Sequence, residues 1–190
     1  GAHSGVSVGP DGATHQAIED IAITRVIPNM VVLAPCDSIE AKKATIAAAR
    51  YKGPVYIRFT REKTPVMTTE DTPFEIGQAE IYRAGKDVTI IGCGPLVYEA
   101  LKAAEELAKE GIEAEVINNH TIKPMDKETI LKSVKKTGCV VTIEEHQAMG
   151  GMGSAVSEIL SQNYPAPMEI IGVKDRFGES GEPAELLEKF

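Results

Sequence analysis

The chain has 190 residues and carries 20 Lys or Arg against 28 Asp or Glu, which gives a formal net charge of −8. This acidic balance argues against a general nucleic-acid binder, which needs a basic face to neutralise phosphates. Hydrophobic residues make up 43% and charged residues 25%, as in ordinary globular proteins, so disorder of the whole chain is excluded. No apolar run reaches about 18 residues, so the sequence predicts no transmembrane helix and no membrane partner.

The N-terminus and the cysteines indicate a cellular compartment. The first twelve residues, GAHSGVSVGPDG, lack the basic start and the apolar stretch of a signal peptide. The chain begins at Gly1 rather than Met, which we interpret as processing or as part of a longer chain. Three cysteines, Cys36, Cys93 and Cys139, form no CxxC motif and lie in or beside apolar sequence. This usage favours a reduced, cytoplasmic protein.

The first section of the chain has an α/β rhythm. The pattern predicts a loop over residues 1–16, a helix over 14–27 with Thr14 as its N-cap, a buried strand over 30–35, an Ala-rich helix over 37–50 capped by Asp37 or Ser38, and a strand over 55–60. Residues 62–75 contain two Pro and four Thr without a helical stripe, and they are the best candidate for a linker.

The final section alternates strands and helices regularly. In chain order the pattern predicts a strand with turns over 77–85, strands over 87–94, 113–119, 139–145 and 168–173, helices over 96–111, 126–138 and 154–163, and a short closing helix over 184–190. This alternation predicts a mostly parallel sheet with right-handed crossovers and helices on both faces.

The N-terminal loop over residues 3–16 is the most site-like stretch. It places His3, Asp11 and His15 among glycines that let the backbone approach a ligand closely. A histidine binds phosphate or moves a proton near neutral pH, and Asp11 accepts hydrogen bonds from hydroxyls. The helix expected after the loop adds amides that favour anions. The pattern alone gives equal weight to a polar surface loop, and its spacing matches no metal-ligand set.

A candidate anion ligand follows the second expected strand. Arg61 comes directly after VYIRFT, and in open α/β sheets the C-terminal strand ends face the ligand crevice. A guanidinium there suits bidentate binding of phosphate or carboxylate. A solvated Arg beside Glu62 is about as consistent with the sequence, and Arg58 is a poorer candidate because strand alternation leaves its direction open.

Two glycine-containing junctions and the side chains of His146 and Cys93 are interpreted as structural and not as parts of a site. Residues 91–95 predict a tight turn rather than a nucleotide site, because the third glycine of GxGxxG is absent. The junction over residues 144–154 predicts close helix packing. We interpret His146 as a surface or packing histidine and Cys93 as a small buried hydrophobe, since no histidine is visibly paired with it.

Taken together, these segments resemble the C-terminal half of transketolase. HSGVSVGPDGATHQ and EDIAITRVIPNMVVLAPCD resemble the last part of that family's pyrimidine-binding domain, and IRFTREKTP resembles the strand and Arg that follow. FEIGQAE, DVTIIGCG, INNHTIKPMD, TIEEHQAMGGMGSAV and RFGESGEPAELLEKF resemble its C-terminal domain in order. The resemblance covers essentially the whole chain, and its most specific element is the DGATHQ loop with His3.

The resemblance implies an α/β fold in two parts. Residues 1–61 are then the end of a parallel-sheet pyrimidine-binding domain, residues 62–75 a linker, and residues 76–190 a three-layer α/β/α C-terminal domain with a mostly parallel sheet.

The resemblance also implies a reaction. The complete enzyme then moves a two-carbon ketol unit from a ketose phosphate to an aldose phosphate, as in the pentose phosphate pathway, with thiamine diphosphate and Mg²⁺ as cofactors. His3 and Arg61 then bind the sugar phosphate, Asp11 contacts a sugar hydroxyl, and His15 is a catalytic residue beside the reacting carbons.

One departure from the family sets the expected partners. Only the last two strands and helices of the pyrimidine-binding domain are found, and no Glu precedes His3 to protonate the cofactor's aminopyrimidine ring. We therefore expect the isolated chain to be inactive and to bind no cofactor, and the complete enzyme to add an N-terminal half or subunit in a homodimer or heterotetramer. We also expect the strand over 30–35 to lack a neighbour, and the section before the linker to be mobile or covered by another chain.

Two alternatives stay open. One is a related enzyme, 1-deoxyxylulose-5-phosphate synthase or the β subunit of a 2-oxo-acid dehydrogenase, although His15 four residues after Asp11 argues for transketolase. The other is a non-catalytic assembly module whose C-terminal domain serves dimer contacts.

Overall fold

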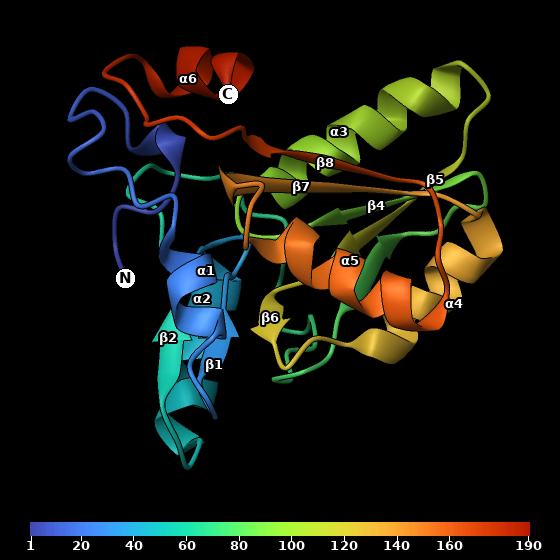
Figure 1. The fold of residues 1–190 in the computed structure, drawn as a ribbon, viewed down its shortest axis with the longest axis horizontal. Helices are drawn as coiled ribbons and strands as arrows, with labels where there is room; N and C mark the ends of the chain where they lie inside the picture. Colours follow the sequence, from blue (N-terminus) through green and yellow to red (C-terminus); the bar gives the residue numbers. More distant parts are fainter.

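Most strands form one five-stranded sheet with the order β3-β5-β4-β7-β8 (Figure 1). The computed structural model describes residues 1–190. Strands β5, β4, β7 and β8 run parallel to one another, with β8 at one edge of the sheet, and β3 is the antiparallel strand at the other edge, so the expected mostly parallel sheet is confirmed. The strands are β3 (Glu80–Arg83), β4 (Val88–Gly92), β5 (Ala114–Asn118), β7 (Val140–Gln147) and β8 (Met168–Val173).

Helices cover both faces of this sheet, as expected. Figure 1 shows α3 on one face and α4 and α5 on the other. Alternation along β4 explains this, because Ile90 packs with Ala100 of α3 while Ile91 packs with Val134 of α4 and Val156 of α5. None of the α-helices has the length and apolar character needed to cross a membrane. The helices of this section are α3 (Leu96–Lys109), α4 (Lys127–Thr137), α5 (Met152–Asn163) and α6 (Pro183–Lys189).

A second, smaller sheet joins the two sections of the chain. It has the order β2-β1-β6, with β1 (Val31–Leu33) parallel to β2 (Val55–Ile57) and antiparallel to β6 (Thr121–Lys123). We expected the first of these strands to lack a neighbour, and that expectation is wrong. The final section supplies β6, a strand that the sequence pattern did not predict.

The first helix is much shorter than expected. It covers only α1 (Asp20–Arg25), because the residues before it bind the N-terminal loop instead. The amide of Ala17 donates to the carbonyl of His3 at 2.9 Å, and the carbonyl of Ala17 accepts from the amide of Gly5 at 2.9 Å. Thr14 is therefore not an N-cap.

The side chain of Asp37 binds the expected linker, residues 62–75, to the first section by hydrogen bonds. Of the two expected caps, Asp37 and Ser38, Asp37 is the N-cap of α2 (Ser38–Arg50), where its carboxylate accepts from the amide of Glu40 at 2.9 Å. The same carboxylate accepts from the amides of Met67 at 2.7 Å and Thr68 at 2.6 Å. Residues 62–75 contain no helix or strand, as expected, yet these bonds hold part of the segment in place.

The final section holds α1 at both ends. At the start of the helix, the ring nitrogen Nε2 of His146 accepts from the amide of Ile21 at 3.1 Å. At its end, the ammonium of Lys123 on β6 donates to the carbonyls of Arg25 at 2.9 Å and Ile27 at 2.7 Å. The last carbonyls of a helix have no partner within it, so these bonds satisfy groups that the short helix cannot satisfy itself.

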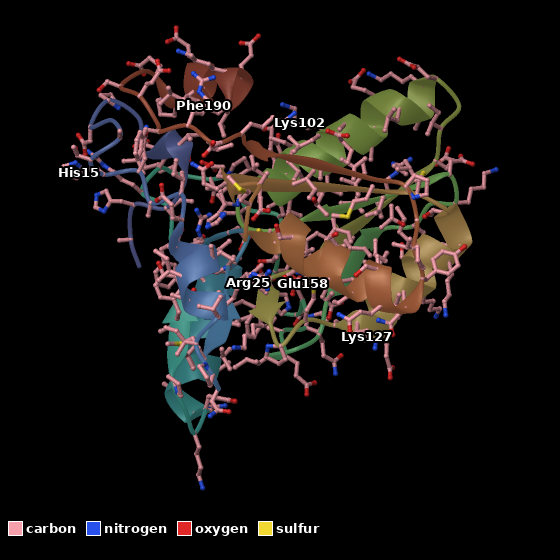
Figure 2. The ribbon with its side chains drawn as sticks, in the orientation of Figure 1. His15, Arg25, Lys102, Lys127, Glu158 and Phe190 are labelled. Carbon is pink, nitrogen blue, oxygen red and sulfur yellow. The ribbon has the colours of Figure 1, made fainter.

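We expect Lys123→Met to lower the free energy of unfolding by about 1 to 2 kcal/mol, because it removes two charge-assisted hydrogen bonds and keeps most of the side chain's apolar stem. Urea unfolding followed by circular dichroism measures the loss. Lys127→Met is the matched control, because Lys127, labelled in Figure 2, is an exposed lysine at the start of α4 that makes no ion pair within the chain. Equal losses in the two variants would contradict the capping role of Lys123.

Candidate functional site

The four predicted site residues lie in two pairs. The guanidinium of Arg61 forms an ion pair with the carboxylate of Asp11, and the two side chains are 43% and 37% exposed. The rings of His3 and His15 meet edge to face, with centroids 6.0 Å apart and an interplanar angle of 65°. Figure 2 places His15 on the N-terminal loop at one edge of the molecule.

These groups suit binding of a hydroxylated anion. Arg61 offers a fixed charge, and the two imidazoles offer ring nitrogens that act as hydrogen-bond donors or acceptors. Nδ1 of His15 lies 3.0 Å from the hydroxyl of Thr14, which orients its ring. The exposed Asp11 accepts hydrogen bonds from hydroxyl groups, so the arrangement combines anion and hydroxyl recognition.

The start of the chain lies along the segment that leads to Arg61. The amide of Phe59 donates to the carbonyl of Gly1 at 2.7 Å, and the amide of Ser4 donates to the carbonyl of Phe59 at 3.1 Å. His3 lies between these bonds with a φ of 65°, a left-handed conformation that is uncommon for a residue other than glycine. The loop and the end of β2 are therefore joined by backbone hydrogen bonds.

The middle of the loop is buried against the final section. The short 3₁₀ turn η1 (Val6–Val8) is buried, and Val6 packs with Ile18, Val173 of β8 and Leu186 of α6. The amide of Ser7 donates to the carboxylate of Glu145 at the end of β7, at 2.9 Å. The accessible site residues thus lie on either side of a turn that contacts with the final section hold in place.

Gly5 is required where the loop meets Glu145. Its φ is +85°, and a Cβ atom at this position would lie 2.2 Å from the carboxylate oxygen of Glu145. Any side chain would displace that carboxylate, so the glycine allows the loop backbone to approach β7.

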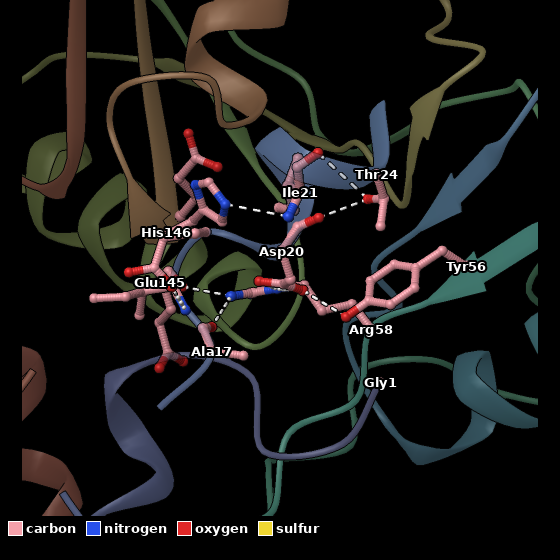
Figure 3. Close-up of polar contacts among 12 residues, drawn as sticks. Gly1, Ala17, Asp20, Ile21, Thr24, Tyr56, Arg58, Glu145 and His146 are labelled. Carbon is pink, nitrogen blue, oxygen red and sulfur yellow. Dashed lines mark hydrogen bonds and ion pairs between the residues drawn. The ribbon is translucent and has the colours of Figure 1, made fainter. Parts of the chain in front are cut away.

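A buried ion pair between Arg58 and Asp20 lies beside the end of the loop and supports it (Figure 3). The guanidinium of Arg58 contacts both carboxylate oxygens of Asp20, at 2.9 and 3.1 Å, and donates to the carbonyls of Ala17 at 2.9 Å and Glu145 at 2.7 Å. The hydroxyl of Tyr56 donates to Asp20 at 3.0 Å. Arg58 is 4% exposed and belongs to the scaffold, in agreement with its lower rank as a ligand-binding candidate.

His146 occupies the helix terminus that we expected to favour an anion. Its Nε2 accepts from the amides of Ile21 at 3.1 Å and Ala22 at 3.3 Å, so its Nδ1 carries the proton and donates to the carbonyl of Gln147 at 2.7 Å. Burial, with the nearby charge of Arg58, lowers the pKa of His146. The ring is fully buried, so the packing interpretation agrees with the structure, and the start of α1 is not an open anion site.

The glycine-rich junction after β7 also serves packing. Glu144 accepts from the amides of Met152 at 2.7 Å and Gly153 at 2.8 Å, so a carboxylate of the protein already occupies the start of α5. Burial raises the pKa of Glu144 to about 7, although both amides oppose this shift. Cys93 is buried in the core, and burial raises the pKa of its thiol, which makes it a poor nucleophile.

The residues that support the candidate site were not predicted. The sequence pattern indicates His3, Asp11, His15 and Arg61 but assigns no role to Glu145, whose carboxylate holds the loop. The available signal was the run Glu144-Glu145-His146 at the end of an otherwise apolar strand, where three polar side chains need partners. No cluster of three or more His, Cys, Asp or Glu side chains in the chain could hold a metal ion.

Two family models match the chain. The transketolase pyrimidine-binding domain matches residues 1–67, and the transketolase C-terminal domain matches residues 77–190. A 6-deoxy-6-sulfo-D-fructose transketolase subunit from Clostridium sp. (strain MSTE9) is 46% identical over 190 residues, which are 100% of this chain and 59% of that protein. A putative transketolase C-terminal section from Methanocaldococcus jannaschii is 47% identical over 191 residues, covering 99% of this chain and 60% of that protein.

Solved structures give the same result for the fold. A split-gene transketolase, described as an inactive β4 tetramer, has a TM-score of 0.93 and 46% identity over 100% of this chain and 60% of its own. Transketolase from Campylobacter jejuni has a TM-score of 0.76 at 23% identity and covers 99% of this chain and 28% of its own, which supports the fold alone. The chain therefore spans about 60% of the length of the curated relatives first named above.

We expect acid to weaken the fold through His146. The unfolded chain takes up a proton near pH 6.5, whereas the folded protein resists it because burial and the nearby charge of Arg58 lower the pKa of His146. Protonation of Nε2 would also break its hydrogen bonds with the amides of Ile21 and Ala22. Stability is therefore lost as the pH falls below 6.5, by at most about 1.4 kcal/mol per pH unit from this group. His146→Gln keeps an acceptor and removes the titration.

Urea unfolding of the wild-type protein and of this variant from pH 7 to pH 5 checks the prediction. As the pH falls, the free energy of unfolding of the wild-type protein should decrease more than that of the variant. A difference between the two proteins that stays constant over this range would exclude the titration of His146 as a cause.

Proposed function

Because the chain belongs to the transketolase family, we propose that it supplies the substrate-binding loop of a thiamine-diphosphate-dependent ketol transferase. The observation that carries this proposal is the grouping of His3, Asp11, His15 and Arg61 on one accessible loop and strand end, as two contacting pairs. The complete enzyme moves a two-carbon ketol unit from a ketose phosphate to an aldose phosphate.

Each site residue has a proposed task. His3 and Arg61 bind the anionic group of the sugar, and Asp11 accepts a hydrogen bond from a sugar hydroxyl. His15 lies beside the reacting carbons and exchanges a proton with the oxygens there. In the free site Arg61 is paired with Asp11, so an incoming anion competes with that carboxylate for the guanidinium. Relatives named for a sulfo-sugar and for apulose 4-phosphate support an anionic sugar as substrate.

The cofactor site is not assigned to this chain's residues. Thiamine diphosphate supplies the carbanion chemistry of such an enzyme when it is bound with Mg²⁺. The chain offers no cluster of three acidic, histidine or cysteine side chains for the metal ion, and its buried Glu40, Glu144 and Glu145 already accept amide hydrogen bonds. We therefore assign the metal and the diphosphate to another part of the enzyme.

The proposed partner is the N-terminal section of a transketolase, as a separate subunit or as part of one chain. Relatives named as a transketolase subunit and as a C-terminal section support this division. A homodimer or heterotetramer then brings the substrate loop to the cofactor. On this proposal the 190 residues alone are inactive, and adding the N-terminal section restores ketol transfer.

A related activity remains as the second candidate. A 1-deoxy-D-xylulose-5-phosphate synthase from Trichormus variabilis is 45% identical over 183 residues, which are 94% of this chain and 29% of that enzyme. The two activities differ in the product. The assembled enzyme assayed for ketol transfer from a ketose phosphate to an aldose phosphate, and for formation of 1-deoxy-D-xylulose 5-phosphate, separates them.

In the assembled enzyme we expect Arg61→Ala to raise the KM for fructose 6-phosphate by about 10- to 100-fold, because a charge-assisted bond to the phosphate is lost. The KM for unphosphorylated fructose should change little. Initial-rate measurements with both donors check this. Arg50→Ala is the control, since Arg50 is an exposed arginine of the same section that makes no ion pair.

Two outcomes would contradict the proposal. If the assembled wild-type enzyme transfers no ketol unit from fructose 6-phosphate, the ketol transferase is rejected. If Arg61→Ala raises the KM for both donors equally, Arg61 does not bind the phosphate.

A further inference from the structure

Glu145 lies where the two arms of the proposed site meet. One arm is the N-terminal loop, and the other is the end of β2 with residues 58–61. The carboxylate of Glu145 accepts from the amide of Ser7 in the loop at 2.9 Å. The backbone carbonyl of Glu145 accepts from Arg58 in the second arm at 2.7 Å (Figure 3). One residue of the final section therefore binds both arms.

A carboxylate is an unfavourable choice for simple packing at this place. Glu145 is 3% exposed, and a buried carboxylate is strongly destabilising unless its partners compensate. The nearby guanidinium of Arg58 forms its ion pair with Asp20 and not with the carboxylate of Glu145. That carboxylate instead accepts a hydrogen bond from the backbone amide of Ser7. The group is thus directed at the loop and away from its own section.

The loop cannot shift easily while this bond exists. Gly5 packs directly against the carboxylate, and Val6 is buried against β8 and α6. His3 precedes this turn and Asp11 follows it, so the turn sets the position of both relative to Arg61.

We infer that Glu145 is a positioning residue of the substrate site, whose carboxylate fixes the η1 turn of the loop while its carbonyl fixes the strand end that carries Arg61. This inference rests on the proposed function. A loop held in its binding geometry loses less entropy when the substrate binds, so the residue acts on affinity without touching the substrate.

Glu144 provides a matched control. It is adjacent on the same strand, it is 1% exposed, and its carboxylate also accepts backbone amides at the start of a helical segment. Its partners belong to α5, within the final section, and it makes no hydrogen bond to the loop. We therefore expect the replacement of Glu144 to destabilise the fold without releasing the proposed site.

In the assembled enzyme we expect Glu145→Ala to raise the KM for fructose 6-phosphate by about tenfold or more, with a smaller change in kcat. Glu145→Gln should recover most of this loss, because its side-chain oxygen still accepts from Ser7. Glu144→Ala should lower the melting temperature and leave the KM near the wild-type value. A similar rise in KM for Glu144→Ala and Glu145→Ala would overturn the inference, as would an unchanged KM in a folded Glu145→Ala enzyme.

Hydrogen exchange of the assembled enzyme gives a readout that does not depend on activity. Glu145→Ala should speed exchange in a peptide covering residues 4–12 and leave α5 unchanged, and Glu144→Ala should do the reverse. If the wild-type enzyme shows no ketol transfer but this exchange pattern holds, the proposed function fails while the anchoring of the loop stands. Unchanged exchange in residues 4–12 of the Glu145→Ala enzyme would refute the anchoring itself.

Discussion

The carboxyl end of β7 satisfies the starts of three helical segments. Glu144 accepts amides of α5, Glu145 accepts an amide of η1, and His146 accepts amides of α1. The first amides of a helix have no partner within it, so each segment depends on an acceptor from elsewhere. Because successive side chains of a strand point to opposite faces, Glu145 reaches the loop while its two neighbours reach α5 and α1.

This constraint joins the two sections into one structure. The first section has only two strands of its own, and β6 from the final section completes its sheet. Lys123 and His146 hold the two ends of α1, and Arg58 ties β2 to the carbonyl of Glu145. Residues matched by the pyrimidine-binding model therefore depend for their positions on residues matched by the C-terminal model.

The same arrangement separates the proposed binding groups from the scaffold. The side chains of Arg61, Asp11 and His15 are accessible on the loop and strand end, whereas the groups that hold the loop are buried. Flexible polar loops bind weakly unless they are fixed, because ordering them costs conformational entropy. In a family whose reaction is performed by a cofactor, positioning of the substrate is the contribution expected from residues of this kind.

Local pattern in the sequence determined the α/β class, the mostly parallel direction of the strands in the main sheet and an N-cap at Asp37 or Ser38, because periodicity and capping depend on neighbours along the chain. It also indicated the loop with His3, Asp11 and His15, through glycines and residue chemistry, although their roles rest on the family resemblance. The tertiary structure decided that α1 begins at Asp20, that β6 completes the small sheet and that Glu145 supports the loop. The late start of α1 depends on the bonds of Ala17 to His3 and Gly5 in the loop. The other two outcomes depend on hydrogen bonds between residues more than eighty positions apart, Ala34 with His120 and Ser7 with Glu145, and no pattern within a short window specifies such partners.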